Sequence, residues 1–201
     1  MDRGVTSALM YENLDDYAHL QREIIEEEGP QAMALGTLLL KKLGPMSVID
    51  IGCGPGIYLL QHKWHGCEVL GIDGCSVAGR CLDKNEFELV DLKRPWMPPK
   101  EFELSLCVEV AEHLPEEYAD LLVDTISYCA PLCFFTAARP NQGGCGHFNL
   151  KPKEYWIEKF SARGFVLDVG LTDELHSVID VDPIYKICQW LPWNAMVLRR
   201  M

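Results

Sequence analysis

Short apolar runs alternate with amphipathic segments along most of this 201-residue chain. The apolar runs are brief and rich in β-branched residues, which is typical of strands buried on both faces of a sheet. The segments between them repeat apolar residues at helical spacing. Strands are predicted at residues 48–51, 68–73, 87–92, 104–110, 132–137, 165–169 and 195–199. Helices are predicted between them at residues 57–63, 76–84, 115–129 and 152–163.

The pattern of residues 15–43 predicts two helices before the first strand. Gly29-Pro30 separates the first helix from the second, which we place at 31–43. Strands then alternate with helices, which indicates an α/β fold with a doubly wound, mostly parallel sheet covered on both faces.

Sheets of this kind bind ligands beyond the carboxyl ends of their strands, near the point where the strand order reverses. Four stretches reach that rim in the predicted fold. They are the turn after Ile51, Asp73, Asp91 and residues 107–113.

The turn after the first strand is unusually rich in glycine. Its sequence is VIDIGCGPGIYLL, and Gly52, Gly54 and Gly56 alternate within it. Glycine permits a positive φ and removes the Cβ that would keep a ligand away from the backbone, and a helix start presents N–H groups. The turn is therefore expected to hold a polar ligand. The nicotinamide-cofactor pattern is G-x-G-x-x-G, whereas this chain reads G-x-G-x-G with Asp50 two residues before it.

This motif resembles motif I of the class I S-adenosylmethionine-dependent methyltransferases. The resemblance covers residues 48–200, about three quarters of the chain. It implies a seven-stranded, mostly parallel Rossmann-like sheet with an antiparallel last strand. It also implies that Asp73 holds the ribose hydroxyls of S-adenosylmethionine and that Asp91 lies near its adenine. The implied cofactor-binding residues are Asp50, Gly52, Cys53, Gly54, Gly56, Asp73, Gly74, Asp91, Leu92 and Glu109.

The stretch CVEVAEHLPEE follows the fourth strand. Pro115 disfavours helical backbone at Leu114, so a tight turn is expected before the next helix. Such a turn can bring Glu109, Glu112 and His113 together. Three interpretations remain open: these side chains brace the following helix, His113 acts as a general base, or the cluster binds a divalent metal.

The spacing E-x-x-E-H is similar to that of ubiquinone-pathway O-methyltransferases and small-RNA 2′-O-methyltransferases. In those groups the two acids and the histidine hold a divalent metal, and a later histidine completes the site of the RNA enzymes. His147 matches that later histidine loosely. The resemblance implies Mg²⁺ or another divalent metal with Glu109, Glu112, His113 and His147 as ligands. The candidate catalytic residues are His113, His147 and Glu109.

Two further segments are candidates to line the acceptor pocket. The glycine-rich loop 140–149 follows the fifth strand, at the ligand rim. Segment 170–193 contains three large aromatic residues and two prolines. It can serve as a lid, a dimer contact or an insertion packed on the sheet.

Composition narrows the possible partners. The formal net charge of −12 argues against nucleic acid and against an anionic membrane surface. Nine scattered cysteines without a Cys-x-x-Cys pair are typical of free thiols in the cytoplasm. There is no signal-peptide pattern and no apolar run of membrane-spanning length. We expect one domain over residues 1–201, with N-terminal helices at 1–45 and the catalytic core at 46–201.

The expected activity is transfer of a methyl group from S-adenosylmethionine to a hydroxyl oxygen of a small molecule or sugar. A nitrogen or protein acceptor is less favoured, because no Asn/Asp-Pro-Pro-aromatic motif follows the fourth strand. Two alternatives are a non-catalytic S-adenosylmethionine-binding subunit and a nicotinamide-cofactor oxidoreductase.

Overall fold

A seven-stranded sheet forms the centre of the computed structural model, which describes residues 14–201, with side chains from residue 19 onward. The strand order is β3-β2-β1-β4-β5-β7-β6. All neighbouring strands from β3 to β5 pair in parallel, and β7 pairs antiparallel with both β5 and β6. This confirms the expected doubly wound sheet with an antiparallel last strand. The strands are β1 (Ser47–Ile51), β2 (Glu68–Asp73), β3 (Phe87–Leu89), β4 (Leu104–Val108), β5 (Leu132–Thr136), β6 (Phe165–Leu167) and β7 (Met196–Arg200).

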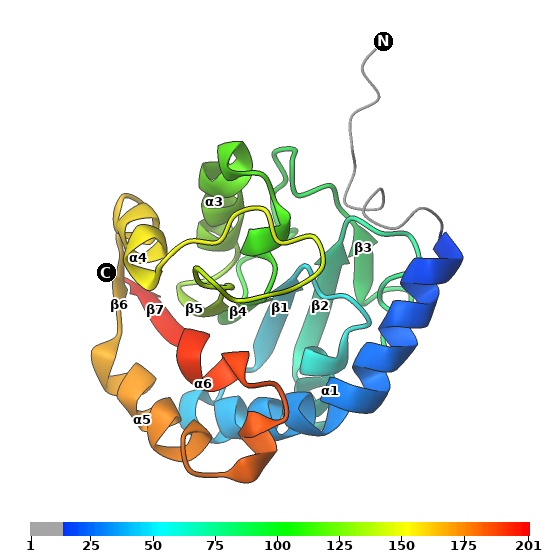
Figure 1. Ribbon diagram of the computed structural model, residues 1–201, viewed down its shortest axis with the longest axis horizontal. Helices are drawn as coiled ribbons and strands as arrows, with labels where there is room; N and C mark the ends of the chain where they lie inside the picture. The colour runs from blue at the N-terminus through cyan, green and yellow to red at the C-terminus, as the bar shows by residue number, and fades with distance from the viewer. Residues whose placement is uncertain (1–13) are drawn as a thin grey trace.

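Helices cover both faces of the sheet (Figure 1). One hydrophobic core lies between the sheet and helices α3 and α4, and a second lies between the sheet and helices α1 and α5. The α-helices are α1 (Leu14–Leu43), α2 (Leu60–Trp64), α3 (Ala119–Cys129), α4 (Lys153–Ser161), α5 (Val169–Ile179) and α6 (Trp190–Asn194). Short 3-10 helices are η2 (Ile57–Leu59), η3 (Ala111–His113), η4 (Glu116–Tyr118) and η5 (Pro183–Lys186).

The N-terminal region differs from the prediction of two helices. A single helix, α1, runs through Pro30 to Leu43. Proline inside a helix removes one backbone hydrogen bond and favours a bend, and Figure 1 shows α1 bending along its length. The helix persists because its apolar face packs into the second core through residues such as Leu35 and Leu39. Residues 1–13 of the predicted N-terminal region lie outside the described part of the chain.

The helix predicted at 76–84 is wrong, because these residues form turns. Gly79 has a left-handed φ of 67°, which ends any helical repeat. The backbone N–H of Gly79 donates to the carbonyl of Gly54, and that of Cys81 donates to the carbonyl of Pro55. These residues therefore bind the glycine turn instead of forming a helical ladder.

Strand β4 ends two residues earlier than predicted. Glu109 has a φ of 51°, a conformation that non-glycine residues rarely adopt, and this turns the chain out of the strand. The N–H of Glu109 donates to the hydroxyl oxygen of Thr136 at 2.9 Å, which ties the turn to β5. The expected tight turn follows as the 3-10 helix η3.

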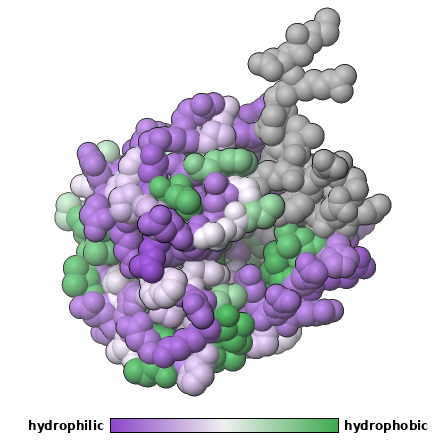
Figure 2. Space-filling view, in the orientation of Figure 1, coloured by the Kyte–Doolittle hydropathy of each residue, from purple (hydrophilic) through white to green (hydrophobic). Residues whose placement is uncertain are grey.

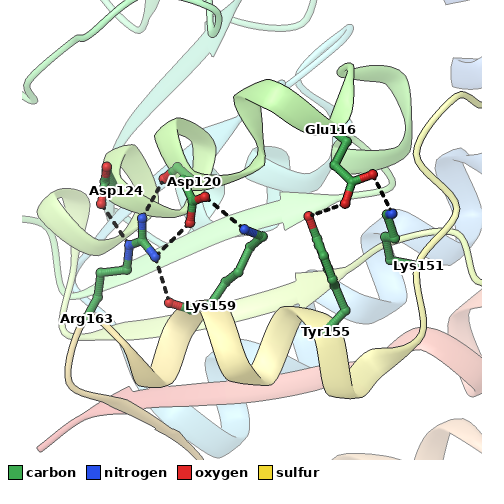
Figure 3. Close-up of polar contacts among 7 residues, drawn as sticks. All are labelled: Glu116, Asp120, Asp124, Lys151, Tyr155, Lys159 and Arg163. Atoms are coloured by element: carbon green, nitrogen blue, oxygen red, sulfur yellow. Dashed lines mark hydrogen bonds and ion pairs between the residues drawn. The ribbon is translucent and has the colours of Figure 1, made fainter.

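Helices α3 and α4 are joined at the surface by ion pairs (Figure 3). Arg163 pairs with Asp120 and Asp124, with its Nε at 2.7 Å from Asp124 Oδ1. Lys159 pairs with Asp120 at 2.9 Å. Each pair is open to solvent on at least one side, so the network fixes the register of the two helices more than it adds stability.

Segment 170–193 is ordered and packed against α1. The Tyr185 hydroxyl donates to the carbonyl of Ala34 at 3.1 Å, and the N–H of Cys188 donates to Gln31 Oε1 at 2.8 Å. Trp190 reaches the cavity described below. Of the uses considered for this segment, packing against the fold is therefore observed.

The face seen in Figure 2 is mostly hydrophilic, with apolar residues scattered among polar ones. Within residues 14–201, no helix has the length and apolar character that crossing a membrane requires. All nine cysteines are free, as their spacing predicts.

Candidate functional site

A cavity of about 370 Å³ opens at the carboxyl ends of the parallel strands. Helix α1, the glycine turn, the segment after β4 and loop 140–149 all contribute to its walls. This is the rim at which the fold is expected to bind a ligand. Most of the residues selected from the sequence line it, namely Asp50, Gly52, Cys53, Gly54, Asp73, Gly74, Asp91, Leu92, Glu109, His113 and His147. Gly56 and Glu112 are not among the lining residues.

The glycine turn owes its shape to close backbone packing. Gly52 has a φ of 75°, and a Cβ at this position would lie 2.6 Å from the Val110 side chain. Gly54 also has a positive φ, but a Cβ there would meet no atom within 4 Å, so this residue faces open space. A ligand can therefore approach the backbone at Gly54.

Three N–H groups of this turn donate to other groups of the protein. Those of Gly52 and Cys53 donate to the carbonyl of Ile72, and that of Gly54 donates to Asp73 Oδ2 at 3.0 Å. The turn therefore lets a ligand approach the backbone closely, but it offers few free hydrogen-bond donors.

Asp73 joins β2 to the glycine turn. Its carboxylate accepts hydrogen bonds from the N–H groups of Gly54 and Cys75, and the side chain is buried. Burial raises the pKa of Asp73, and these two N–H donors oppose the rise. Asp91 accepts from the backbone N–H of Lys93 at 3.0 Å and lies at the same wall of the cavity. Both acids therefore line the cavity that begins at the glycine turn.

Asp50 is a buried acid whose side chain is not fully hydrogen-bonded. It is 1% exposed, and its Oδ2 has no hydrogen-bond partner. Burial, with a contribution from the Asp73 charge, raises the pKa of Asp50 to about 8. A buried oxygen of this kind is costly unless a ligand supplies a donor. S-adenosylmethionine carries an ammonium and ribose hydroxyls, so the residues present fit this cofactor.

Glu109 is held by two side-chain amides. Gln142 Nε2 donates to Glu109 Oε2 at 2.6 Å, and Asn194 Nδ2 donates to Oε1 at 2.9 Å. Asn194 Nδ2 also donates to Gln142 Oε1 at 2.9 Å, which closes the triangle. One carboxylate thus connects the end of β4, loop 140–149 and helix α6. These bonds hold the Glu109 charge in a fixed position at the cavity.

Glu112, His113 and His147 form a second, adjacent cluster. One potential ligand atom from each lies within 4.8 Å of the others, and the two imidazole rings meet edge to face with centroids 5.0 Å apart. Neither carboxylate oxygen of Glu112 has a partner of good hydrogen-bond geometry. Burial raises the pKa of Glu112, the Glu109 charge adds to the rise, and nearby backbone N–H groups oppose it. Glu109 is not part of this close group.

Both histidines turn their Nδ1 atoms to the backbone of loop 140–149. His113 Nδ1 lies 3.1 Å from the carbonyl oxygen of Gly146, and His147 Nδ1 lies 3.4 Å from that of Gln142. A carbonyl only accepts hydrogen bonds, so Nδ1 is the donor in each contact, and in a neutral ring Nε2 then keeps its lone pair. Burial and the neighbouring His147 lower the pKa of His113, which favours this neutral form.

This arrangement suits either proton transfer or metal binding. A neutral imidazole with Nδ1 tied to a carbonyl is the usual form of a histidine ligand, and also that of a general base. The donor set of Glu112, His113 and His147 fits a divalent cation, because a carboxylate oxygen and two imidazole nitrogens lie within 4.8 Å of one another. Of the four metal ligands expected from the sequence, three are therefore brought together.

Several lining or supporting residues were missed by the sequence analysis. Glu28 and Tyr58 line the cavity from α1 and η2, and the Tyr58 hydroxyl lies 3.4 Å from Glu28 Oε2. Gln142 and Asn194 fix Glu109 from distant parts of the chain. No local motif marks these residues. The aromatic content of segment 170–193 was the only signal, and it pointed to Trp190.

The fold is shared with solved methyltransferases. The sugar N-methyltransferase KedS8 from Streptoalloteichus sp ATCC 53650 superposes with a TM-score of 0.68 at 13% identity, covering 100% of this chain and 95% of that one. The plantazolicin methyltransferase BpumL, solved with a triazolic desmethylPZN analog and SAH, gives a TM-score of 0.64 at 16% identity, with coverages of 97% and 95%. At these identities the likeness concerns the fold.

Sequence comparison gives more direct relatives. Trans-aconitate 2-methyltransferase of Escherichia fergusonii is 27% identical over 123 residues, which is 58% of this chain and 48% of the relative. The chain therefore spans about half the length of this curated relative. A family model described as a methyltransferase domain matches residues 17–168. Because that match covers most of the chain and contains the glycine turn and the cavity acids, the protein belongs to the family of methyltransferase domains.

Proposed function

We propose that this protein transfers a methyl group from S-adenosylmethionine to a hydroxyl oxygen of a small molecule or sugar. The observation that carries the proposal is the position of His113 and His147. Both line the cavity that begins at the glycine turn, and both turn Nδ1 to a backbone carbonyl. A base is therefore available beside the place where a cofactor fits.

When bound, S-adenosylmethionine supplies an electrophilic methyl group on a positively charged sulfur. The walls of the cavity exclude water and hold the acceptor hydroxyl in line with that methyl group. Nε2 of His113 or His147 would take the hydroxyl proton as the methyl group passes from the sulfur to the acceptor oxygen, with S-adenosylhomocysteine as the leaving group. Glu109, fixed by Gln142 and Asn194, accepts a hydrogen bond from the acceptor and orients it.

The charge of the cavity supports a neutral or cationic acceptor. Five acidic side chains line it, those of Glu28, Asp50, Asp73, Asp91 and Glu109. Because its pKa is raised to about 8, Asp50 adds little negative charge at neutral pH. Trans-aconitate, on which the curated relative acts, is a tricarboxylate and would be repelled by such walls. A sugar, the acceptor class of the structural neighbour KedS8, suits them better.

A divalent cation at Glu112, His113 and His147 is a second version of the same proposal. It is supported by the closeness of the three ligand groups. A bound cation would lower the pKa of the acceptor hydroxyl. Exhaustive chelation followed by addition of single metals separates the two versions. Activity that survives chelation rejects the metal version and retains the histidine base.

The test is a labelled-methyl assay with an acceptor panel. S-adenosylmethionine carrying a ¹³C-methyl group is incubated with sugars and other small hydroxyl compounds, and products are read by NMR. The proposal expects a signal at the chemical shift of a methyl ether. A signal typical of an N-methyl group would move the acceptor atom to nitrogen. Cofactor binding without any labelled product over the whole panel would favour the non-catalytic alternative.

A further inference from the structure

The cavity has two ends with different surroundings. Asp73 and Asp91, at the ends of β2 and β3, form the end that fits the ribose and adenine of the cofactor. Glu28 of α1 and Glu109 after β4 line the other end, together with Tyr58 and Trp190. Glu28, Tyr58 and Trp190 are not part of the cofactor motif, so their chemistry describes what else the site binds.

The two carboxylates at this end are held in different ways. Glu109 is fixed by hydrogen bonds of 2.6 and 2.9 Å from Gln142 and Asn194. Glu28 has a single, longer contact of 3.4 Å with the Tyr58 hydroxyl. Glu28 thus retains lone pairs that face the cavity and are free to accept from a ligand.

Positive charge from the protein is scarce here. Among the described lining residues, Lys93 is the only lysine or arginine, and it follows Asp91 at the cofactor end. Burial raises the pKa of Glu28, and the Glu109 charge raises it further. Two carboxylates that repel each other in a partly desolvated space favour a cationic ligand and disfavour an anion.

A second observation concerns hydrogen bonding and is independent of the charge count. Asp50 also lines the cavity, is 1% exposed and has an unpartnered Oδ2. The Tyr58 hydroxyl lies in the electrostatic field of Asp50, Glu28 and Glu109, which places all three acids around one part of the cavity. This part of the cavity therefore contains an acceptor oxygen, Asp50 Oδ2, to which a ligand can donate.

We propose that Glu28 and Glu109 form an ammonium subsite, with the rings of Tyr58 and Trp190 as its walls. An ammonium offers three donors and a positive charge, which matches fixed carboxylates beside an aromatic face. The inference rests on the proposed function and names its substrate class: an acceptor that carries an amine as well as the hydroxyl to be methylated. The α-ammonium of the cofactor is the other source of the same chemistry.

The first arm of the test separates these two sources. Glu28→Gln keeps the shape of the side chain and removes its charge. Glu27→Gln, a matched control, makes the same charge change one residue away on the exposed side of α1. Both variants are titrated calorimetrically with S-adenosylhomocysteine and with an analogue that lacks the α-amino group. If the cofactor's ammonium occupies the subsite, E28Q lowers the affinity for S-adenosylhomocysteine about tenfold or more. The affinity for the analogue without the α-amino group is then unchanged.

The second arm uses small amines, each paired with its hydroxyl and its carboxylate analogue, added to the protein saturated with S-adenosylhomocysteine. If the subsite binds the acceptor, amines bind most tightly and carboxylates least tightly. E28Q then lowers the affinity for the amines about tenfold, whereas E27Q does not.

Two outcomes would overturn the proposal. One is that E28Q and E27Q have equal affinities for every ligand tested. The other is that the wild type binds carboxylates as tightly as amines. The second comparison needs no variant, so it stands even if E28Q folds poorly. Failure of the wild type to bind S-adenosylhomocysteine would instead reject the proposed function.

Discussion

Five carboxylates line one cavity, and each has a different environment. Asp73 accepts two backbone hydrogen bonds, Asp50 has an oxygen with no partner, and Glu109 is clamped by two amides. These differences follow from what surrounds each side chain, since the residue types are nearly the same. Substitutions at these positions should therefore have distinct effects.

Asp73→Ala should weaken cofactor binding. The substitution removes an acceptor for the ribose hydroxyls and also the link between β2 and Gly54, so a loss of about 1.5–3 kcal/mol is expected. Calorimetric titration of S-adenosylhomocysteine measures it. Asp83→Ala, at an exposed acid paired with Lys63, is the control and should bind normally. Equal affinities for the two variants would remove Asp73 from the cofactor site.

His113→Ala should separate catalysis from cofactor binding. General acid–base groups contribute about 10²–10⁴-fold to rate, so turnover should fall by at least about a hundredfold. The glycine turn is intact in this variant, so affinity for S-adenosylhomocysteine should be retained. His65→Ala changes an exposed histidine elsewhere and should keep full activity. Normal turnover of H113A would show that His113 is not the base.

His62 should make stability fall in mild acid. It is fully buried under α1, its Nε2 has no partner, and burial lowers its pKa from 6.5 to about 4. Between pH 6.5 and pH 4, His62 is therefore protonated in the unfolded chain and neutral in the folded chain. Its stabilising contribution is complete above pH 6.5 and is lost as the pH falls toward 4, by about 3 kcal/mol in total.

Urea unfolding of wild type and His62→Asn between pH 7 and pH 4 tests this effect, since the shared titrations of other groups cancel in the difference. Asn retains a polar group near the Tyr58 carbonyl, to which His62 Nδ1 lies at 3.2 Å. The wild type should lose stability faster on acidification than the variant does. Parallel curves would contradict the prediction.

At the scale of elements, the strands could be predicted, whereas the unbroken course of α1, the turns at 76–84 and the helices α5 and α6 could not. Strands β1, β2, β4 and β5 are apolar runs whose side chains are mostly buried, so their pattern is decided locally. Helix α1 continues through Pro30 because tertiary packing outweighs the local cost of a proline. Residues 76–84 form turns because their backbone binds the glycine turn, a contact that no local pattern reveals.

The α3–α4 ion pairs allow a test of how much surface charge contributes. Arg163→Ala should lower the free energy of unfolding by about 1 kcal/mol, because its partners Asp120 and Asp124 are partly exposed. Arg163→Lys should recover part of the loss, since an ammonium cannot span both acids as the guanidinium does. Urea unfolding at low and high salt measures both variants, and the loss should shrink in high salt. A salt-independent loss of several kcal/mol would mean that the Arg163 stem matters through packing.

At the scale of the whole molecule, the part of the cavity formed by the motif residues could be predicted from the sequence, and the remaining part could not. The motif acids and glycines sit at strand ends, whose place the alternating pattern fixes. Glu28 and Asn194 come from opposite ends of the chain, and Asn194 is 85 residues from Glu109, which it binds. Only the closed fold brings them together, as residue spacing carries no signal over such distances.

We propose that this cavity binds S-adenosylmethionine as the methyl donor of the protein. The most direct measurement is a calorimetric titration of the wild-type protein with S-adenosylhomocysteine and, separately, with NAD(H). A ligand that binds only the native state should also raise the unfolding temperature. We predict saturable binding of one S-adenosylhomocysteine per chain and none of NAD(H). Binding of NAD(H) without S-adenosylhomocysteine would contradict the assignment and favour an oxidoreductase.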